Sequence, residues 1–216
     1  MQKPQPTSRY RHAIRLGILL IISVFSLQGC STEPPPNSHD ICNVFQQYPA
    51  WYWDSLNSYN RWGIPISVQM AIIQQESDFR ADAAPPRTKL LGTIPWTRPT
   101  SAYGYAQAVD DTWAEYQKET KNSGADRDNF NDAVDFIGWY SSNASRTLKI
   151  NKRDAYHLYL AYHEGMGNYA QGSYKNQQWL LDVANHVQQT ANRYRTQLTY
   201  CYKKIPKPSA WSSLFN

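Results

Sequence analysis

Apolar and polar positions follow a helical period through most of the chain. From Asp40 to Tyr59 the aromatic and apolar residues recur three or four positions apart, and Pro49 marks a break within this run. The pattern predicts one packed helix or a pair of helices. After Pro65, which suits the first turn of a helix, apolar positions continue at steps of four until Glu76 takes the next step. Glu76 is therefore expected on the apolar face of a helix.

The rest of the pattern is also helical, apart from one loop. Residues 83–100 contain four prolines and cannot form a regular helix, so they predict a long loop. Further helices are expected over residues 106–121, 131–147, 154–163 with Asp154 as the cap, and 179–198. The expected fold is a single mostly α-helical domain over residues 39–202, all helices with a long Pro-rich loop.

The first 29 residues have the layout of an export signal. A basic start precedes an apolar stretch from Leu16 to Leu27, which is shorter than the roughly 20 residues that span a bilayer. Residues 27–30 read LQGC and resemble a bacterial lipobox, which implies cleavage before Cys30 and acylation of this cysteine. An ordinary cleaved signal with a leftover cysteine is the alternative. We expect a signal peptide over 1–29 and a lipidated cysteine with a flexible tether over 30–38.

The position after the cysteine bears on localisation. Ser31 in place of an aspartate resembles lipoproteins that are sorted to the outer membrane. The sequence therefore predicts attachment to the membrane through Cys30, at the periplasmic face of the outer membrane. At the other end, residues 203–216 have two prolines and no periodicity, which predicts a disordered tail.

The basic charge of the chain belongs mainly to its leader. The formal net charge is +5, but Lys3, Arg9, Arg11 and Arg15 lie within the first 29 residues, where there is no acid. The remainder has 18 basic and 17 acidic residues. Nucleic-acid binding rests on clustered Lys and Arg that neutralise phosphates, so no nucleic-acid partner is expected.

Two cysteines remain if Cys30 is lipidated. Cys42 lies near the start of the predicted domain and Cys201 near its end. Two cysteines in an exported chain predict a disulfide, with two unpaired thiols as the alternative. His157, His163 and Glu164 do not have the spacing of a metal-binding His-Glu-x-x-His motif. We expect neither a metal nor a cofactor.

Glu76 is the strongest candidate for chemistry. A carboxylate on an apolar helix face is unfavourable unless it is paired or protonated, and the Pro-rich loop that follows places it near a helix C-terminus. Both burial and the negative end of the helix dipole would raise its pKa, as a general acid requires. From the residues alone, a glutamate that reaches solvent or a basic partner is the alternative.

Four short features follow one another along the chain: AIIQQES over residues 71–77, YGYAQ over 103–107, LAYHEG over 160–165, and Tyr194. They resemble the motifs of the lytic transglycosylase domain found in soluble lytic transglycosylases and goose-type lysozyme relatives. The first carries that family's Glu-Ser pair, the second the glycine and glutamine of Gly-Leu-Met-Gln, and the third resembles Ala-Tyr-Asn-Ala-Gly. The likeness covers roughly residues 43–202. Within the family, the loop segments at residues 85–92 and 94–96 resemble those of the short membrane-bound, endo-acting branch.

The resemblance implies a lysozyme-like fold and a lytic transglycosylase of peptidoglycan. Glu76 would act as acid and then base at the bond between N-acetylmuramic acid and N-acetylglucosamine, giving 1,6-anhydromuramyl products. The residues implied to contact substrate are Ser77, Tyr105, Gln107, Tyr162, His163 and Tyr194. Two departures stand out, because Tyr105-Ala106 replaces Leu-Met and His163 replaces the usual Asn.

Two other functions stay open at this point. A hydrolytic muramidase of the same fold would need a second carboxylate to position water, and Asp78, Asp82, Asp110, Asp111 and Glu164 are candidates. A lipoprotein that binds murein without turnover is the third reading, although a buried acid such as Glu76 would bring a pure binder no benefit.

Overall fold

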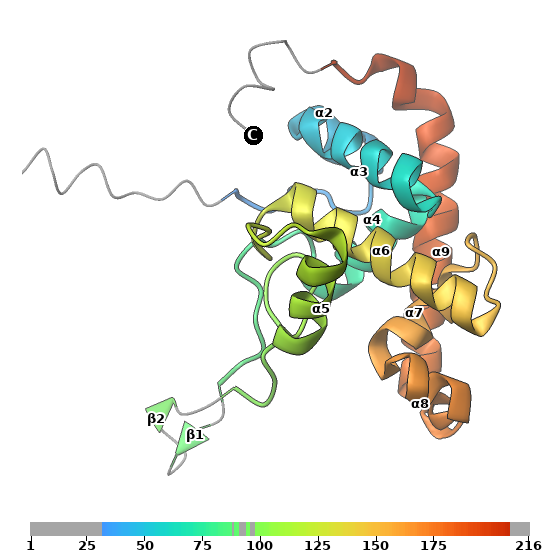
Figure 1. Cartoon of the computed structure of the whole chain (residues 1–216). Helices are drawn as coiled ribbons and strands as arrows, with labels where there is room; N and C mark the ends of the chain where they lie inside the picture. Colours follow the sequence, from blue (N-terminus) through green and yellow to red (C-terminus); the bar gives the residue numbers. More distant parts are fainter. Residues whose placement is uncertain (1–31, 88, 91–93, 96–97, 208–216) are drawn as a thin grey trace, which may run out of the picture. The chain divides into compact units, whose positions relative to one another are not determined.

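The computed structural model describes residues 32–87, 89–90, 94–95 and 98–207. Eight α-helices fill most of this part of the chain (Figure 1): α2 Ile41–Gln47, α3 Pro49–Trp62, α4 Ile66–Ser77, α5 Asp110–Thr120, α6 Phe130–Leu148, α7 Ala155–Glu164, α8 Met166–Gln171 and α9 Gln178–Cys201. Two short 3-10 helices, η1 Ser173–Asn176 and η2 Tyr202–Lys204, flank α9. The predicted mostly α-helical single domain is confirmed.

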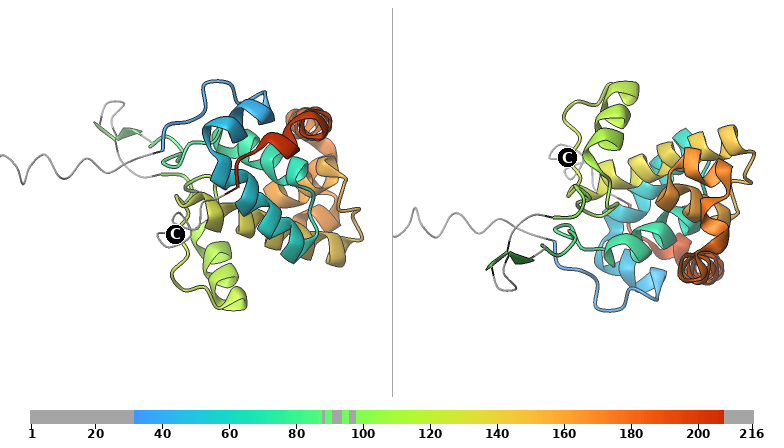
Figure 2. Two further views of the ribbon diagram at one scale, coloured as in Figure 1. Left: turned by 90° about the horizontal axis from the view of Figure 1, so that it is seen from above. Right: turned by 90° about the horizontal axis from the view of Figure 1, so that it is seen from below.

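The helix α4 is the centre of the fold. Every residue from Ser67 to Ile73 is buried, so all sides of this helix are covered. It packs against α3, α6, α7 and above all α9, which stands along one side of the bundle and is seen end-on in both views of Figure 2. A helix that is covered on all sides lies inside the domain, and the two polar residues of this run, Ser67 and Gln69, are buried with the rest. The end of α4 is therefore held in place by the whole core.

Polar side chains start three of the helices. Asp40 accepts hydrogen bonds from the backbone N–H groups of Cys42 and Asn43, at 2.9 and 3.3 Å. Asn129 caps α6 in the same way. The predicted cap at Asp154 is confirmed, since its carboxylate accepts from the His157 N–H at 3.0 Å. These bonds satisfy N–H groups that have no partner inside the helix.

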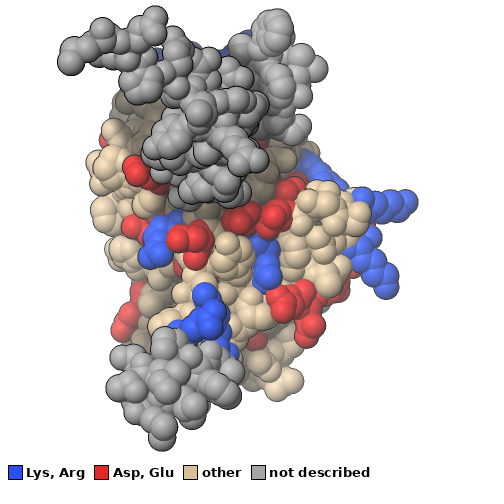
Figure 3. All heavy atoms as spheres, turned by 90° about the vertical axis from the view of Figure 1, so that its left-hand side faces the viewer, with Lys and Arg blue, Asp and Glu red and all other residues tan. Residues whose placement is uncertain are grey.

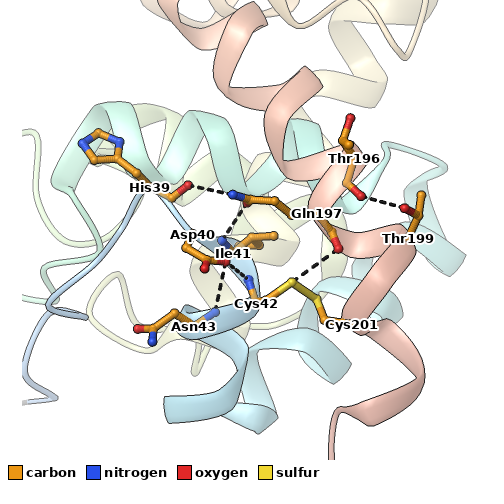
Figure 4. Close-up of a disulfide and its surroundings, with 9 residues drawn as sticks. All are labelled: His39, Asp40, Ile41, Cys42, Asn43, Thr196, Gln197, Thr199 and Cys201. Atoms are coloured by element: carbon orange, nitrogen blue, oxygen red, sulfur yellow. Dashed lines mark hydrogen bonds between the residues drawn. A yellow bond between two sulfur atoms is a disulfide. The ribbon is translucent and has the colours of Figure 1, made fainter.

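A disulfide joins the two ends of the domain, as the cysteine count predicted. It links Cys42 in α2 to Cys201 at the end of α9, with their Cα atoms 5.9 Å apart and a sequence separation of 159. Gln197 reinforces the junction (Figure 4): its Oε1 accepts from the Ile41 N–H at 3.0 Å and its Nε2 donates to the His39 carbonyl at 3.3 Å. The alternative of two unpaired thiols is wrong.

Two segments predicted to be flexible are packed on the domain where the structure describes them. In the predicted tether over 30–38, Pro35 and Ser38 are buried, and tyrosine hydroxyls of Tyr48 and Tyr194 donate to the carbonyls of Glu33 and Ser38. These hydroxyls hold the backbone of residues 32–38 against the domain at two points, and the flexible tether stays a prediction. Cys30 and the signal segment lie outside the described residues.

The start of the predicted disordered tail has contacts with the domain. Residues 202–204 form η2, Ile205 is buried, and the Pro206 carbonyl accepts from the Trp53 indole N–H at 2.7 Å. One apolar side chain and one hydrogen bond thus place this stretch on the domain, and the disordered tail stays a prediction. Residues 208–216 lie outside the described part.

The remaining differences concern boundaries and short elements. The helix expected from residue 106 begins at Asp110, because residues 103–109 form a turn with an isolated bridge between Tyr103 and Ala108. The helix α8 and η1 were not predicted, since neither is long enough to show a period. The Pro-rich loop contains a two-residue antiparallel hairpin, β1 Lys89–Leu90 and β2 Ile94–Pro95.

The surface charge is mixed. On the face shown in Figure 3, acidic and basic side chains are interspersed. This agrees with the near balance of charges outside the leader. In the part of the chain that is described, no helix has the length and apolar character needed to cross a membrane.

Candidate active site

A cleft opens at the C-terminal end of α4. Its volume is about 390 Å³, and it is walled by the 100–112 region, α6 and α7; its lining residues are Glu76, Thr100, Ala102, Gln107, Ala108, Val109, Thr112, Phe136, Tyr140, Tyr162, His163 and Gly165. Three of the seven residues with predicted roles at the site, Gln107, Tyr162 and His163, thus meet Glu76 around one cavity. Glu76 is the sole carboxylate among these lining residues.

Glu76 combines burial with access to the cleft. It is the last but one residue of α4, so it comes three positions after the seven-residue buried run of this helix and lines the cavity. Burial raises the pKa of its carboxyl to about 7, and a hydrogen bond with the Tyr159 side chain opposes that rise. A carboxyl group with this pKa can give up and take back a proton near neutral pH, which is what general acid and base catalysis needs.

Tyrosines of α6 and α7 form the wall around the acid. The Tyr162 hydroxyl donates to the Ala106 carbonyl at 2.5 Å, and the Tyr140 hydroxyl donates to the Ala161 carbonyl at 3.0 Å. Both hydroxyls are engaged with backbone groups, so these rings act as fixed, mostly apolar walls. Burial and the nearby Glu76 raise the pKa of Tyr159 and of Tyr162, so both stay neutral.

The turn over residues 103–108 places Gln107 in the cleft. Gly104 has φ +76°, and a Cβ there would lie 2.1 Å from the Arg127 carbonyl oxygen, so only glycine fits. Gln107 itself has φ +49°, held because its side-chain Nε2 donates to the carbonyls of Ala83 and Gly104, at 2.8 and 2.9 Å. With the amide nitrogen bound inside the turn, the amide oxygen is the atom available to a ligand.

Three residues with predicted substrate contacts lie in the core instead of at the cleft. Ser77 is buried and its hydroxyl donates back along α4 to the Ile73 carbonyl, at 3.2 Å. Tyr105 is 1% exposed and packs edge-on against Trp51 and Phe130. Tyr194 is fully buried and donates to the Ser38 carbonyl. Their positions give each of them a structural contact, and none lines the cleft.

The other acids named from the sequence are not among the residues that line the cleft. Asp110 pairs with Arg127 at 2.9 Å, and Asp82 is exposed beside Arg80 at 3.5 Å. Asp78 and Asp111 are exposed, and Glu164 accepts from Gln177 at 3.0 Å. Among the described residues, no group of three His, Cys, Asp or Glu side chains could hold a metal ion.

Sequence reasoning missed several residues of the site. Phe136 and Tyr140 line the cleft from α6, and Tyr159 reaches Glu76 from α7. Each of them sits in an apolar helix stripe that looks like ordinary core. A signal was present for Tyr159, because it lies three positions before Tyr162 and therefore on a neighbouring part of the same helix face.

A second and larger cavity, of about 640 Å³, opens at the other end of α4. It is bounded by α3, α9 and the turn at residues 151–153. Its lining residues include no carboxylate and no histidine, so it offers no group for acid and base chemistry near neutral pH. Size alone would point to this cavity, whereas the chemistry points to the smaller one.

Comparison with known proteins places this geometry in a family. No curated protein matches the chain. Residues 18–201, however, match the transglycosylase SLT domain. The match includes α4 with Glu76, the turn with Gln107 and α7 with Tyr162. Because it covers most of the chain, the protein belongs to the transglycosylase SLT domain family, which implies transglycosylase activity on peptidoglycan.

Proposed function

We propose that the protein is a lytic transglycosylase that cleaves the β-1,4 bond between N-acetylmuramic acid and N-acetylglucosamine in peptidoglycan. The bond breaks without water and leaves a 1,6-anhydromuramyl end. One observation supports this reaction most strongly: the cleft of an SLT-family chain has a single lining carboxylate, Glu76, whose pKa burial raises to about 7.

Glu76 serves both halves of the reaction. In the protonated form it gives its proton to the glycosidic oxygen while the bond from that oxygen to the muramyl C1 breaks. The resulting carboxylate then takes the proton of the muramyl C6 hydroxyl, and the C6 oxygen bonds to C1. The glutamic acid is regenerated, and the acetamido group of the sugar stabilises the developing positive charge.

The single carboxylate separates this reaction from hydrolysis. Ordinary glycosidases use a second carboxylate, about 5–5.5 Å away as a nucleophile or about 6.5–9.5 Å away as a base for water. None of the cleft's described lining residues supplies one besides Glu76. In the proposed reaction the muramyl C6 hydroxyl takes the place of the carboxylate nucleophile or of the activated water. The substrate itself therefore provides the nucleophile.

The cleft walls suit a sugar chain. The amide oxygen of Gln107 is placed to accept from an acetamido N–H, while Tyr162 and Tyr140 add aromatic surface to the lining of the cavity. His163 lines the same cavity; its Nδ1 lies 3.4 Å from Glu164 Oε1, so Nε2 is the ring nitrogen that it offers to sugar hydroxyls. Ser77, Tyr105 and Tyr194 have structural roles in this proposal, because they stabilise the elements that carry the cleft.

The test is to incubate the full-length chain, purified in detergent, with peptidoglycan and to analyse the released fragments by mass spectrometry. Anhydromuramyl ends are expected. Fragments with reducing muramyl ends, heavier by one water, would instead indicate a hydrolytic muramidase. Binding without any release would favour a murein-binding lipoprotein, and either result would overturn the proposal.

The pH dependence of the reaction should respond to Tyr159. Because Glu76 must be protonated to act as the acid, activity is expected to fall as pH rises through the pKa of its carboxyl, near 7. Tyr159→Phe removes a hydrogen bond that lowers this pKa. The fall should therefore move to higher pH, measured as peptidoglycan release across a pH series.

Tyr156→Phe is the matched control, since Tyr156 lies on the same helix and does not line the cleft. Its profile should coincide with that of the unchanged protein. A Tyr159→Phe profile that keeps its position, or moves to lower pH, would contradict the assignment of the alkaline fall to Glu76.

We further propose that the protein is attached by a lipid on Cys30 to the periplasmic face of the outer membrane, as in the short membrane-bound endo-type branch of the family. The sequence at residues 27–30 and Ser31 support this. Cys30→Ser should move the protein from the outer-membrane fraction to the soluble periplasmic fraction. Unchanged membrane attachment would contradict the proposal.

A further inference from the structure

A row of rings leads from the acid to the surface of the domain. Tyr159 is a hydrogen-bond partner of Glu76, and the His163 ring follows one turn later on α7, with its centroid 6.3 Å from that of Tyr159. The Trp179 ring comes next, from the start of α9, with its centroid 5.2 Å from His163 and an interplanar angle of 76°. Trp179 is not itself among the cleft's lining residues, but it contacts the exposed His163, which is.

Trp179 is unusually open to solvent for its size. Its exposed fraction is 55%, while the adjacent Leu180 is fully buried. Core packing of α9 is carried by Leu180 and the positions that follow it at helical spacing, so the fold does not need the tryptophan for its interior. A large ring that contacts a cleft residue on one side and water on the other is free to receive a ligand.

The corner that carries Trp179 is fixed by a polar cluster. The Glu164 side chain is 11% exposed and accepts from the Ser173 hydroxyl and from Gln177 Nε2. Gln177 also donates to the Ser173 carbonyl at 3.2 Å, and its own carbonyl accepts from the N–H groups of Leu180 and Leu181 in α9, at 2.9 and 3.1 Å. These bonds tie the end of α7 to the start of α9. The backbone that carries Trp179 is therefore fixed before any ligand arrives.

We propose that Trp179 is a stacking platform for a pyranose ring, which extends the glycan cleft by one subsite beyond His163. The inference rests on the proposed function, since it takes the occupant of the cleft to be a glycan strand. The apolar C–H face of a sugar would lie on the exposed tryptophan face, and the fixed corner would keep the ordering entropy of the protein small. The platform favours long glycans over short ones.

The test measures binding by calorimetry at one pH, with N-acetylglucosamine oligomers of two to six units as probes. The full-length chain carries Glu76→Gln so that no cleavage occurs. Trp179→Ala in this background should lower the affinity for the six-unit oligomer about tenfold and leave the affinity for the two-unit oligomer unchanged. Trp179→Phe should restore most of the affinity for the long oligomer. Tyr200→Ala is the matched control, because Tyr200 is a 76% exposed aromatic residue at the far end of α9.

The possible outcomes separate the platform from the function. Equal affinities of the Trp179→Ala and parent proteins for every length would overturn the platform and leave the lytic reaction standing. A loss of affinity that is equal for short and long oligomers, or that Trp179→Phe does not restore, would mean that Trp179 only supports His163. That result would also overturn the proposed platform. If the parent protein bound no oligomer, the assignment of the cleft to glycans would fail, and the platform with it.

Discussion

Glu76→Gln should abolish the release of peptidoglycan fragments while the protein keeps its fold. General acid and base catalysis contributes about 10²–10⁴ to a rate, and here one group performs both steps, so a loss at the upper end of this range is expected. Glutamine has nearly the same shape but cannot donate the proton. The measurement is the initial rate of anhydromuramyl release under identical conditions for both proteins.

The same substitution should stabilise the protein at alkaline pH. Burial raises the pKa of Glu76 to about 7 in the folded state, above its ordinary value of 4.5. Below pH 4.5 the carboxyl is neutral in both states, whereas between 4.5 and 7 the unfolded chain ionises first, so the folded state loses stability as pH rises. The melting temperature of Glu76→Gln should therefore exceed that of the unchanged protein more at pH 8 than at pH 4.

Asp82→Asn provides the control, because Asp82 is an exposed carboxylate outside the cleft lining. It should keep the activity and show no stabilisation at alkaline pH. Residual activity of Glu76→Gln near the original rate would remove Glu76 from the mechanism. A drop in activity without the alkaline stabilisation would mean that Glu76 is not buried as described.

Loss of the disulfide should give the largest change in stability. The bond closes a loop of 159 positions, and removing a native disulfide of a small exported domain typically lowers the free energy of unfolding by about 2–5 kcal/mol. Replacing both Cys42 and Cys201 by serine should therefore lower the melting temperature by roughly 10 °C. Thermal unfolding followed by circular dichroism measures the difference.

Reductant distinguishes the covalent bond from the packing of the two residues. Added to the unchanged protein, it should bring the melting temperature close to that of the double serine variant. Added to the variant, it should change nothing. Equal melting temperatures of the oxidised and reduced protein would show that the junction is held by its other contacts, such as those of Gln197.

The sequence was most informative where the position of a residue follows from the helix that contains it, without contacts from other elements. The period of α4 placed Glu76 on a buried face and near a helix end, and both features hold in the structure. The motif around Gln107 was also visible in the sequence, but the reason for its glycine was not. Gly104 is required because the carbonyl of Arg127, 23 positions later in the sequence, lies too close for a Cβ atom. Short-range patterns carry no information about such an approach.

Contacts between distant elements explain the rest. Tyr105 and Tyr194 are equally polar in sequence, yet one packs on Trp51 and the other holds Ser38, so neither lines the cleft. Nothing in the residues 32–38 themselves predicts that they pack, because the hydroxyls that bind them come from α9 and from the residue before α3. Tyrosine hydroxyls were thus the least predictable part of both the core and the site.

The docking of residues 32–38 determines how far the enzyme could reach. Glu33 is held to the domain by Tyr48, and only three residue steps separate it from Cys30. Three extended residues span about 10 Å at most. If Cys30 carries the proposed lipid, the folded domain would therefore stay close to the bilayer surface. The glycan strands that it could contact would then be those of the wall layer nearest the membrane.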